Sequence, residues 1–308
     1  MKRTTGLLMV AMLAVGMAAR AGGFGRAALQ DSKPTLTQQP TSPSAQKPAG
    51  QASQAAAAPP AAYQPTPDEV AAVKAIQTEL DPNRTLQLVG DFEKKYPGSP
   101  NLQTVYLYAA QAYRQTNKLD KAIEYAEKIV KLNGNNILGL MTLAELLPQP
   151  QMLQGLGDAD RDKRLTEAQT DAEHALELIT AMPKQPNQTD EQLANNKKLL
   201  AAGVHGSLGL VHLQRATESL SGNDPGELAK AETEYKAALA VDKPDEANYF
   251  RLGEVLQSEN KLDDAIQAFS KASEISQGNG DSALQSMADQ EVQKLKRAKP
   301  AAAPAAKP

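Results

Sequence analysis

One seven-residue segment of this chain occurs twice, and that repetition restricts the possible folds more than any other feature of the sequence. Residues 117–123 read NKLDKAI and residues 260–266 read NKLDDAI, so six of the seven positions are identical. A match of this length at equivalent points of two periodic stretches indicates an internal repeat, and repeats of a few tens of residues are typical of solenoids. The sequence therefore predicts a row of similar stacked units.

The stretch 246–280 indicates what one unit is. Apolar residues recur in it at spacings of three and four, which places them on one face of each of two successive helices. The first set is Tyr249, Leu252, Gly253 and Leu256, and the second set is Ala265, Phe269 and Ala272. The small residues Gly253 and Ala265 are expected where the two helices come closest. One pair leaves apolar surface uncovered, so the unit needs neighbours.

This pattern resembles the 34-residue tetratricopeptide repeat. The resemblance implies an all-α fold, a right-handed superhelical solenoid of antiparallel helix pairs. About five units and a C-terminal capping helix are expected within residues 66–296, and Ala231 and Ala265, 34 residues apart, place the last two units in tandem. The expected boundaries are 66–100, 103–136, 137–186, 202–245 and 246–280 for the units and 281–296 for the capping helix.

Two units are longer than the family repeat. Leu147 and Ala172 are 25 residues apart, where the family spacing is about nine. The excess predicts an insertion of about 16 residues, either a loop or an extended helix start. In the fourth unit His212 and Ala231 are 19 residues apart, and residues 221–226 between them form a cluster of turn-favouring residues.

Both ends of the chain differ in composition from the repeats. Residues 1–21 resemble a bacterial secretory signal peptide, with Lys2 and Arg3, a 14-residue apolar run and Ala19-Arg20-Ala21 as the cleavage pattern. A periplasmic or secreted protein with no stable membrane span after cleavage is therefore expected. An uncleaved signal anchor is the alternative, although the run is shorter than the roughly 20 residues that span a bilayer. Residues 22–65, rich in Pro, Ala and Gln, and residues 297–308, rich in Ala, Pro and Lys, are expected to be disordered.

Composition argues against several kinds of chemistry. The chain has no cysteine and three histidines, so thiol nucleophiles and disulfides are excluded and common metal sites lack ligands. A formal net charge of -3 does not favour nucleic acid as a partner. No P-loop, dinucleotide-binding glycine pattern or hydrolase motif occurs. We therefore expect no catalytic residues, no cofactor and no metal site.

Three aspartates in the insertion can be compared with a calcium loop. Asp158, Asp160 and Asp162 alternate like its opening, but Lys163 and Gln169 stand where such a loop has glycine and glutamate. A solvated acidic turn is the better interpretation. Likewise, the seven residues between His205 and His212 correspond to about 10 Å of helix, too far for one metal ion, so hydrogen-bonded packing positions are favoured.

The resemblance implies a binding surface on the first helix of each unit, at its second, fifth, ninth and twelfth positions. The predicted contact residues are Leu107, Gln111, Arg114, Leu138, Met141, Leu210, Leu213, Phe250, Glu254 and Gln257. Because the central positions are apolar, a hydrophobic peptide or an amphipathic helix is the expected ligand. The alternative is that the chain's own insertion, 148–167, or its C-terminal helix fills this groove.

Two classes of function follow. The first is a non-enzymatic scaffold of the cell envelope that binds a partner protein or peptide in the concave groove. The second is a solenoid that supports the processing or binding of an envelope polymer, such as peptidoglycan or polysaccharide, through its insertions.

Overall fold

The computed structural model describes residues 63–217 and 223–298, and these residues form helices and connecting turns. The predicted signal peptide, most of the predicted linker and residues 299–308 lie outside the described residues. The helices are α2 (Pro67–Thr78), α3 (Pro82–Lys95), α4 (Leu102–Gln115), α5 (Leu119–Leu132), α6 (Ile137–Leu146), α7 (Pro150–Leu153), α8 (Asp158–Ala181), α9 (Asp190–Thr217), α10 (Pro225–Leu239), α11 (Glu246–Ser258), α12 (Leu262–Asn279) and α13 (Ser282–Ala298).

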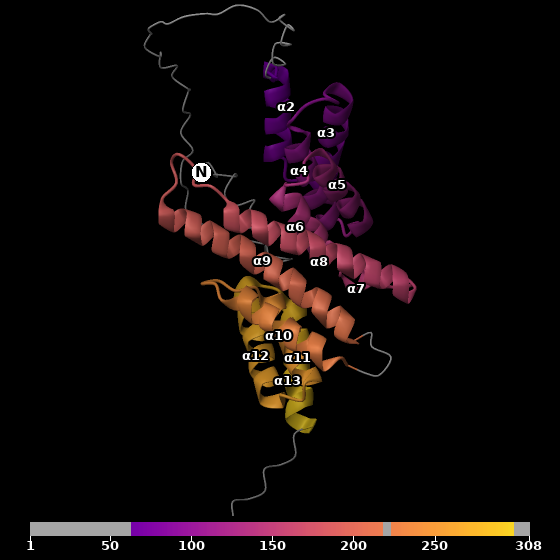
Figure 1. The fold of residues 1–308 in the computed structure, drawn as a ribbon, viewed down its shortest axis with the longest axis vertical. Helices are drawn as coiled ribbons and strands as arrows, with labels where there is room; N and C mark the ends of the chain where they lie inside the picture. The colour runs from indigo at the N-terminus through magenta and orange to yellow at the C-terminus, as the bar shows by residue number, and fades with distance from the viewer. Residues whose placement is uncertain (1–62, 218–222, 299–308) are drawn as a thin grey trace, which may run out of the picture.

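Helices that follow one another in the sequence pack on one another. The pairs α9 with α10 and α11 with α12 form the most extensive contacts, followed by α4 with α5 and α12 with α13. In Figure 1 the long helices α8 and α9 lie side by side across the middle of the molecule, with α2–α6 on one side and α10–α13 on the other. The predicted all-α solenoid of stacked helix pairs is confirmed.

The repeated segment marks the turn between the two helices of a unit. Its first residue is Asn117 in one copy and Asn260 in the other, and both have positive φ, 55° and 61°. Asparagine tolerates this left-handed conformation better than most residues. The amide of the next residue then donates back to the first helix, Lys118 to the Tyr113 carbonyl at 2.9 Å and Lys261 to the Leu256 carbonyl at 2.8 Å. The duplication in sequence is thus a duplication of turn geometry.

The small residues of the repeat lie where the helices approach most closely. A Cβ atom added to Gly253 would stand 2.8 Å from the ring of Phe269, and one added to Gly209 would stand 2.8 Å from the ring of Tyr235. Both rings are fully buried. The aromatic ring of the second helix therefore fills the space that the missing side chain of the first helix leaves, as the pattern predicted.

The insertion is largely helical. It forms the short helix α7 and the first turns of α8, so the extended-helix alternative is correct and a 16-residue loop is not. Helix α9 begins at Asp190, 12 residues before the predicted start near Ala202 (202 minus 190). Thr189 and Gln192 form a reciprocal cap, in which each side chain accepts from the other's backbone amide at 3.1 and 2.9 Å. This capping box fixes the earlier start.

A polar contact joins each of three units to the segment that follows it. In each case an asparagine amide donates to an oxygen near the start of a first helix, about one repeat earlier. The pairs are Asn101 with Glu69 at 2.9 Å, Asn136 with Gln103 at 3.0 Å, and Asn279 with Glu246 at 3.2 and 3.1 Å. Glu69 and Glu246 are buried, so water does not solvate their carboxylates. The asparagine amides supply the hydrogen-bond donors that buried carboxylates need.

The helices at the two ends of the described solenoid each expose one large apolar side chain. The exposed face of α13 carries Met287, which is 51% exposed, among mostly polar side chains: Ser282, Ser286, Asp289, Gln290, Gln293 and Lys294. At the other end Val70 of α2 is 53% exposed. Tyr63, within the predicted disordered linker, is described and donates its hydroxyl to Glu69 at 2.5 Å. None of the helices in the described part of the chain is long and apolar enough to cross a membrane.

Candidate functional site

The predicted contact residues lie on the first helices of four units. Helix α4 carries Leu107, Gln111 and Arg114, α6 carries Leu138 and Met141, α9 carries Leu210 and Leu213, and α11 carries Phe250, Glu254 and Gln257. The predicted binding surface is therefore the side of the solenoid that α4, α6, α9 and α11 form.

Most of the apolar contact residues are inaccessible. Leu107, Met141, Leu210, Leu213 and Phe250 are only 3–9% exposed, and Leu138 is half-buried. The prediction that these five side chains form an accessible apolar groove is therefore wrong, because they pack against other side chains of this chain. The physical reason is contact between neighbouring first helices, as when Leu213 of α9 and Phe250 of α11 join one core cluster. A sequence pattern for one unit does not reveal how tightly the next unit packs on it.

The accessible part of the predicted surface is polar. Gln111 and Gln257 are half-buried and Glu254 is exposed, whereas the Arg114 side chain is only 16% exposed. Amide groups can donate and accept hydrogen bonds at once, and the Glu254 carboxylate adds a negative charge. This surface therefore suits a polar segment better than an apolar helix.

An arginine–glutamate pair connects two of the first helices. Arg114 of α4 lies 2.5 Å from the Glu145 carboxylate of α6, and both side chains are largely buried. Burial raises the pKa of Glu145, while the positive charges of Arg114 and Arg251 oppose that rise. Arg251 of α11 also donates to Gln149, just after α6, at 3.4 Å. Three units thus meet through one polar cluster, and the contact with Gln149 joins the start of the insertion to α11.

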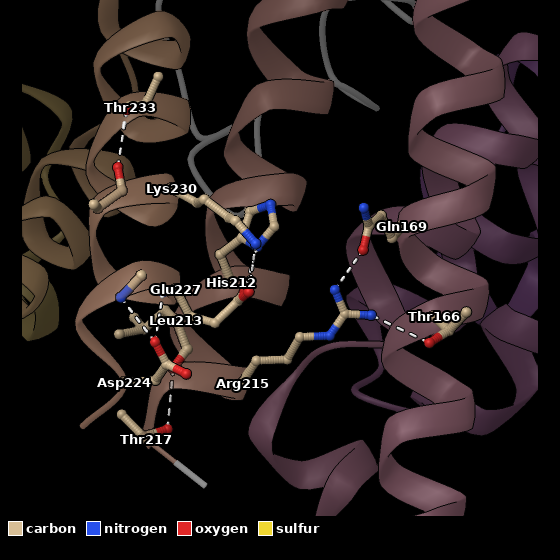
Figure 2. Close-up of polar contacts among 12 residues, drawn as sticks. Thr166, Gln169, His212, Leu213, Arg215, Thr217, Asp224, Glu227, Lys230 and Thr233 are labelled. Carbon is tan, nitrogen blue, oxygen red and sulfur yellow. Dashed lines mark hydrogen bonds and ion pairs between the residues drawn. The ribbon is translucent and has the colours of Figure 1, made fainter. Parts of the chain in front are cut away.

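Both histidines of α9 are paired with carboxylates of α10. His205 Nδ1 lies 2.6 Å from Glu234 Oε2, and His212 Nδ1 lies 2.7 Å from Glu227 Oε2. In Figure 2 the His212 ring points one nitrogen at Glu227 and the other away from it. The expected hydrogen-bonded packing role for these histidines therefore holds, and the carboxylate partners are new. The described residues contain no group of three or more His, Cys, Asp or Glu side chains able to hold a metal ion.

A polar cleft of about 500 Å³ lies beside the His212 pair. Its lining residues are Gln169, His212, Ala229, Lys230, Thr233 and Glu234, from α8, α9 and α10. Arg215 crosses from α9 to α8, where it donates to Gln169 and to Thr166 (Figure 2). The polar side chains of the cleft already have partners inside the protein: Lys230, for example, donates to Glu227 at 2.7 Å.

Two aspartates outside this cleft have strongly raised pKa values. Burial raises the pKa of Asp171 on α8 to about 6, with a smaller contribution from the charge of Glu167. Burial likewise raises the pKa of Asp245, the N-cap of α11, to about 6, and the neighbouring Glu246 adds to it. The other aspartates of interest, Asp158, Asp160 and Asp162, are exposed at the start of α8 and so occupy a helix rather than a calcium loop.

Stacked helix pairs with close glycine–aromatic contacts and an accessible polar inner face define a helical-repeat scaffold. The family model that matches is described as tetratricopeptide repeat, and it covers residues 104–136 and 247–279. The chain therefore contains tetratricopeptide repeats at these two places. Repeats of this family generally mediate protein–protein interaction, and their fold is typical of non-enzymatic scaffolds.

A solved structure supports the fold. The chain is similar to a thermophilic tetratricopeptide-repeat protein from Thermus thermophilus, with 18% sequence identity and a TM-score of 0.50. The similarity covers 73% of this chain and 99% of that chain. The search of curated proteins found no match to the sequence.

Proposed function

We propose that this protein is a non-enzymatic scaffold that holds a segment of a partner protein against its first helices. The observation that carries the proposal is the accessible polar surface formed by Gln111, Glu254 and Gln257 on two tetratricopeptide units. Side-chain amides can bond to the backbone of an extended peptide, whereas the Glu254 carboxylate favours side chains of positive charge. The partner segment is therefore expected to be polar and extended, or a helix with a polar contact face.

Variants on the accessible surface test this proposal. Peptides selected from a random display library on the immobilised full-length chain are expected to bind the double variant Glu254→Lys, Gln257→Lys at least about tenfold more weakly, a loss of about 1.4 kcal/mol. Calorimetric titration of each selected peptide measures the affinity. The buried Leu210 and Phe250 are unsuitable for this test, because charged substitutions there would unfold the protein.

The matched control is Gln267→Lys with Glu274→Lys, which makes the same changes on exposed positions of the second helix α12. These substitutions should leave the affinity unchanged, and circular dichroism should show that both double variants remain helical. Equal weakening by the two double variants would indicate a non-specific effect of charge, and no weakening by either would refute the proposed surface.

We further propose that the scaffold acts in the cell envelope, after export. The support is the signal-like pattern of residues 1–21. The mature protein is expected to begin at Gly22, and mass spectrometry of the N-terminus from the envelope fraction measures this directly. A protein that keeps Met1 and remains in the soluble cytoplasmic fraction would contradict export.

A further inference from the structure

One side-chain contact joins the third unit to the fifth and passes over the fourth. Arg251 of α11 donates from Nη2 to the side-chain oxygen of Gln149, which follows the end of α6, at 3.4 Å. The two residues are 102 positions apart in the sequence. Helix α9 packs on α6 on one side and on α11 on the other (Figure 1). Because a solenoid unit normally contacts only its neighbours, this hydrogen bond departs from the repeat geometry.

The acceptor of this hydrogen bond is held in place by its own unit. Gln149 lies between Pro148 and Pro150, and a proline restricts its own backbone and that of the residue before it. Gln149 accordingly has an extended backbone, with φ -63° and ψ 137°. Its side-chain nitrogen donates to the Glu145 carbonyl at 2.9 Å, which leaves the amide oxygen to accept from Arg251. The third unit therefore presents a fixed acceptor to the fifth.

Arg251 stands between carboxylates of two units. Burial raises the pKa of Glu145 in the third unit and of Glu254 one turn along α11, and the charge of Arg251 opposes both rises. Arg114 of α4 pairs with the same Glu145 at 2.5 Å. Arg251 thus has two alternative sets of partners, Glu145 and Gln149 across the units or Glu254 on its own helix. The structure contains the first arrangement.

The packing of α9 does not by itself fix the angle between α6 and α11. Crossing angles between packed helices scatter by about 15–20° around their preferred values. Two successive interfaces, α6 with α9 and α9 with α11, therefore leave the orientation of α11 relative to α6 loosely determined. A direct contact between the outer two of these three helices removes that freedom.

We propose that Arg251 is a strap that fixes the curvature of the solenoid by tying the fifth unit to the end of α6 across the fourth unit. When the strap is released, Arg251 turns to Glu254 of its own helix, and α11 moves away from α6 through small shifts at the two interfaces of α9. This inference concerns the shape of the scaffold and stands independently of its proposed binding surface.

Distances between spin labels on the full-length chain test the strap. The chain has no cysteine, so Gln115→Cys and Ser258→Cys, at exposed positions that end α4 and α11, carry the two labels. In this labelled chain, Arg251→Gln is expected to broaden the distance distribution and to lengthen its mean by at least about 2 Å, the size of typical helix shifts at interfaces. Pulsed electron spin resonance measures the distribution, and an unchanged distribution would overturn the proposal.

Arg84→Gln is the matched control for the loss of an arginine. Arg84 lies on α3 and is exposed, and it donates within its own helix, to Gln87 at 2.9 Å. This variant should leave the distance distribution unchanged, and circular dichroism should show that both variants remain helical. An equal change in Arg84→Gln and Arg251→Gln would mean that the lost charge, and not the contact with Gln149, alters the shape.

Removing the acceptor is a second test, in which the arginine is kept. Gln149→Ala deletes the side-chain amide and is expected to lengthen the mean distance in the same direction. The double variant Arg251→Gln, Gln149→Ala should change it no more than the larger of the two single changes, because residues that form one contact are not additive. Additive changes, or a wild-type distance in Gln149→Ala, would refute the strap.

Discussion

Replacing Tyr235 by alanine is expected to lower the free energy of unfolding by about 3–5 kcal/mol, the usual cost of emptying a large aromatic site. Its ring is fully buried and fills the space over Gly209 in the interface of α9 and α10. It belongs to a core cluster that includes Leu213 and Phe250, so the cavity would also weaken the contact of unit 4 with unit 5. Denaturant unfolding followed by circular dichroism measures the change.

Tyr235→Phe is the control for this prediction. The hydroxyl of Tyr235 is buried and has no hydrogen-bond partner among the described residues, and burial raises its pKa. Removing an unpaired buried hydroxyl should leave the stability unchanged or raise it by up to about 1 kcal/mol. If Tyr235→Phe lowered the free energy of unfolding as much as Tyr235→Ala, the hydroxyl rather than the ring would be the stabilising group.

The substitution Gly253→Ala is expected to lower the free energy of unfolding by about 1–3 kcal/mol, the range for overpacking a filled core. The added methyl group would stand 2.8 Å from two ring carbons of Phe269. That ring is fully buried and packs edge-on against Phe250, at 5.1 Å between centroids, so it cannot move aside freely. Chemical denaturation at constant pH gives the change directly.

Gly90→Ala is the same substitution at a site without the contact. Gly90 lies inside α3, and nothing lies within 4 Å of an added Cβ there. Alanine is a better helix former than glycine by about 0.5–1 kcal/mol, so this variant should be more stable than the wild type. Opposite signs for the two variants are therefore expected; destabilisation by both would show that steric contact with Phe269 is not the cause.

The parts of this fold that were predictable from sequence are those with a short, local cause. The spacing of Leu252, Gly253 and Leu256 predicted which residues share one face of their helix, because residues three and four apart lie on the same side. The expected close approach of the two helices at Gly253 was likewise correct, and the structure adds that Phe269 is the residue in contact there. The asparagine turns were predicted in position, through the duplication of 117–123 in 260–266, although not in their left-handed geometry.

The contacts that were not predicted join residues far apart in the sequence. Glu234 lies 29 residues from His205, and Glu145 lies 31 residues from Arg114. Neither separation follows from helix periodicity. The burial of Leu213 against α11 was also not predictable, because the distance between neighbouring units depends on side-chain packing and not on the repeat pattern. By contrast, the capping box of Thr189 and Gln192 was a local signal, and it would have located the start of α9.

The surfaces of the two end helices affect how the molecule can assemble. A stack of repeats with an apolar surface at both ends could add copies head to tail without limit, as heterologous contacts that do not close produce filaments. Here each end helix exposes one large apolar side chain, Val70 of α2 at 53% and Met287 of α13 at 51%. A single side chain is a small apolar area for such a contact, so end-to-end growth along the solenoid axis is disfavoured.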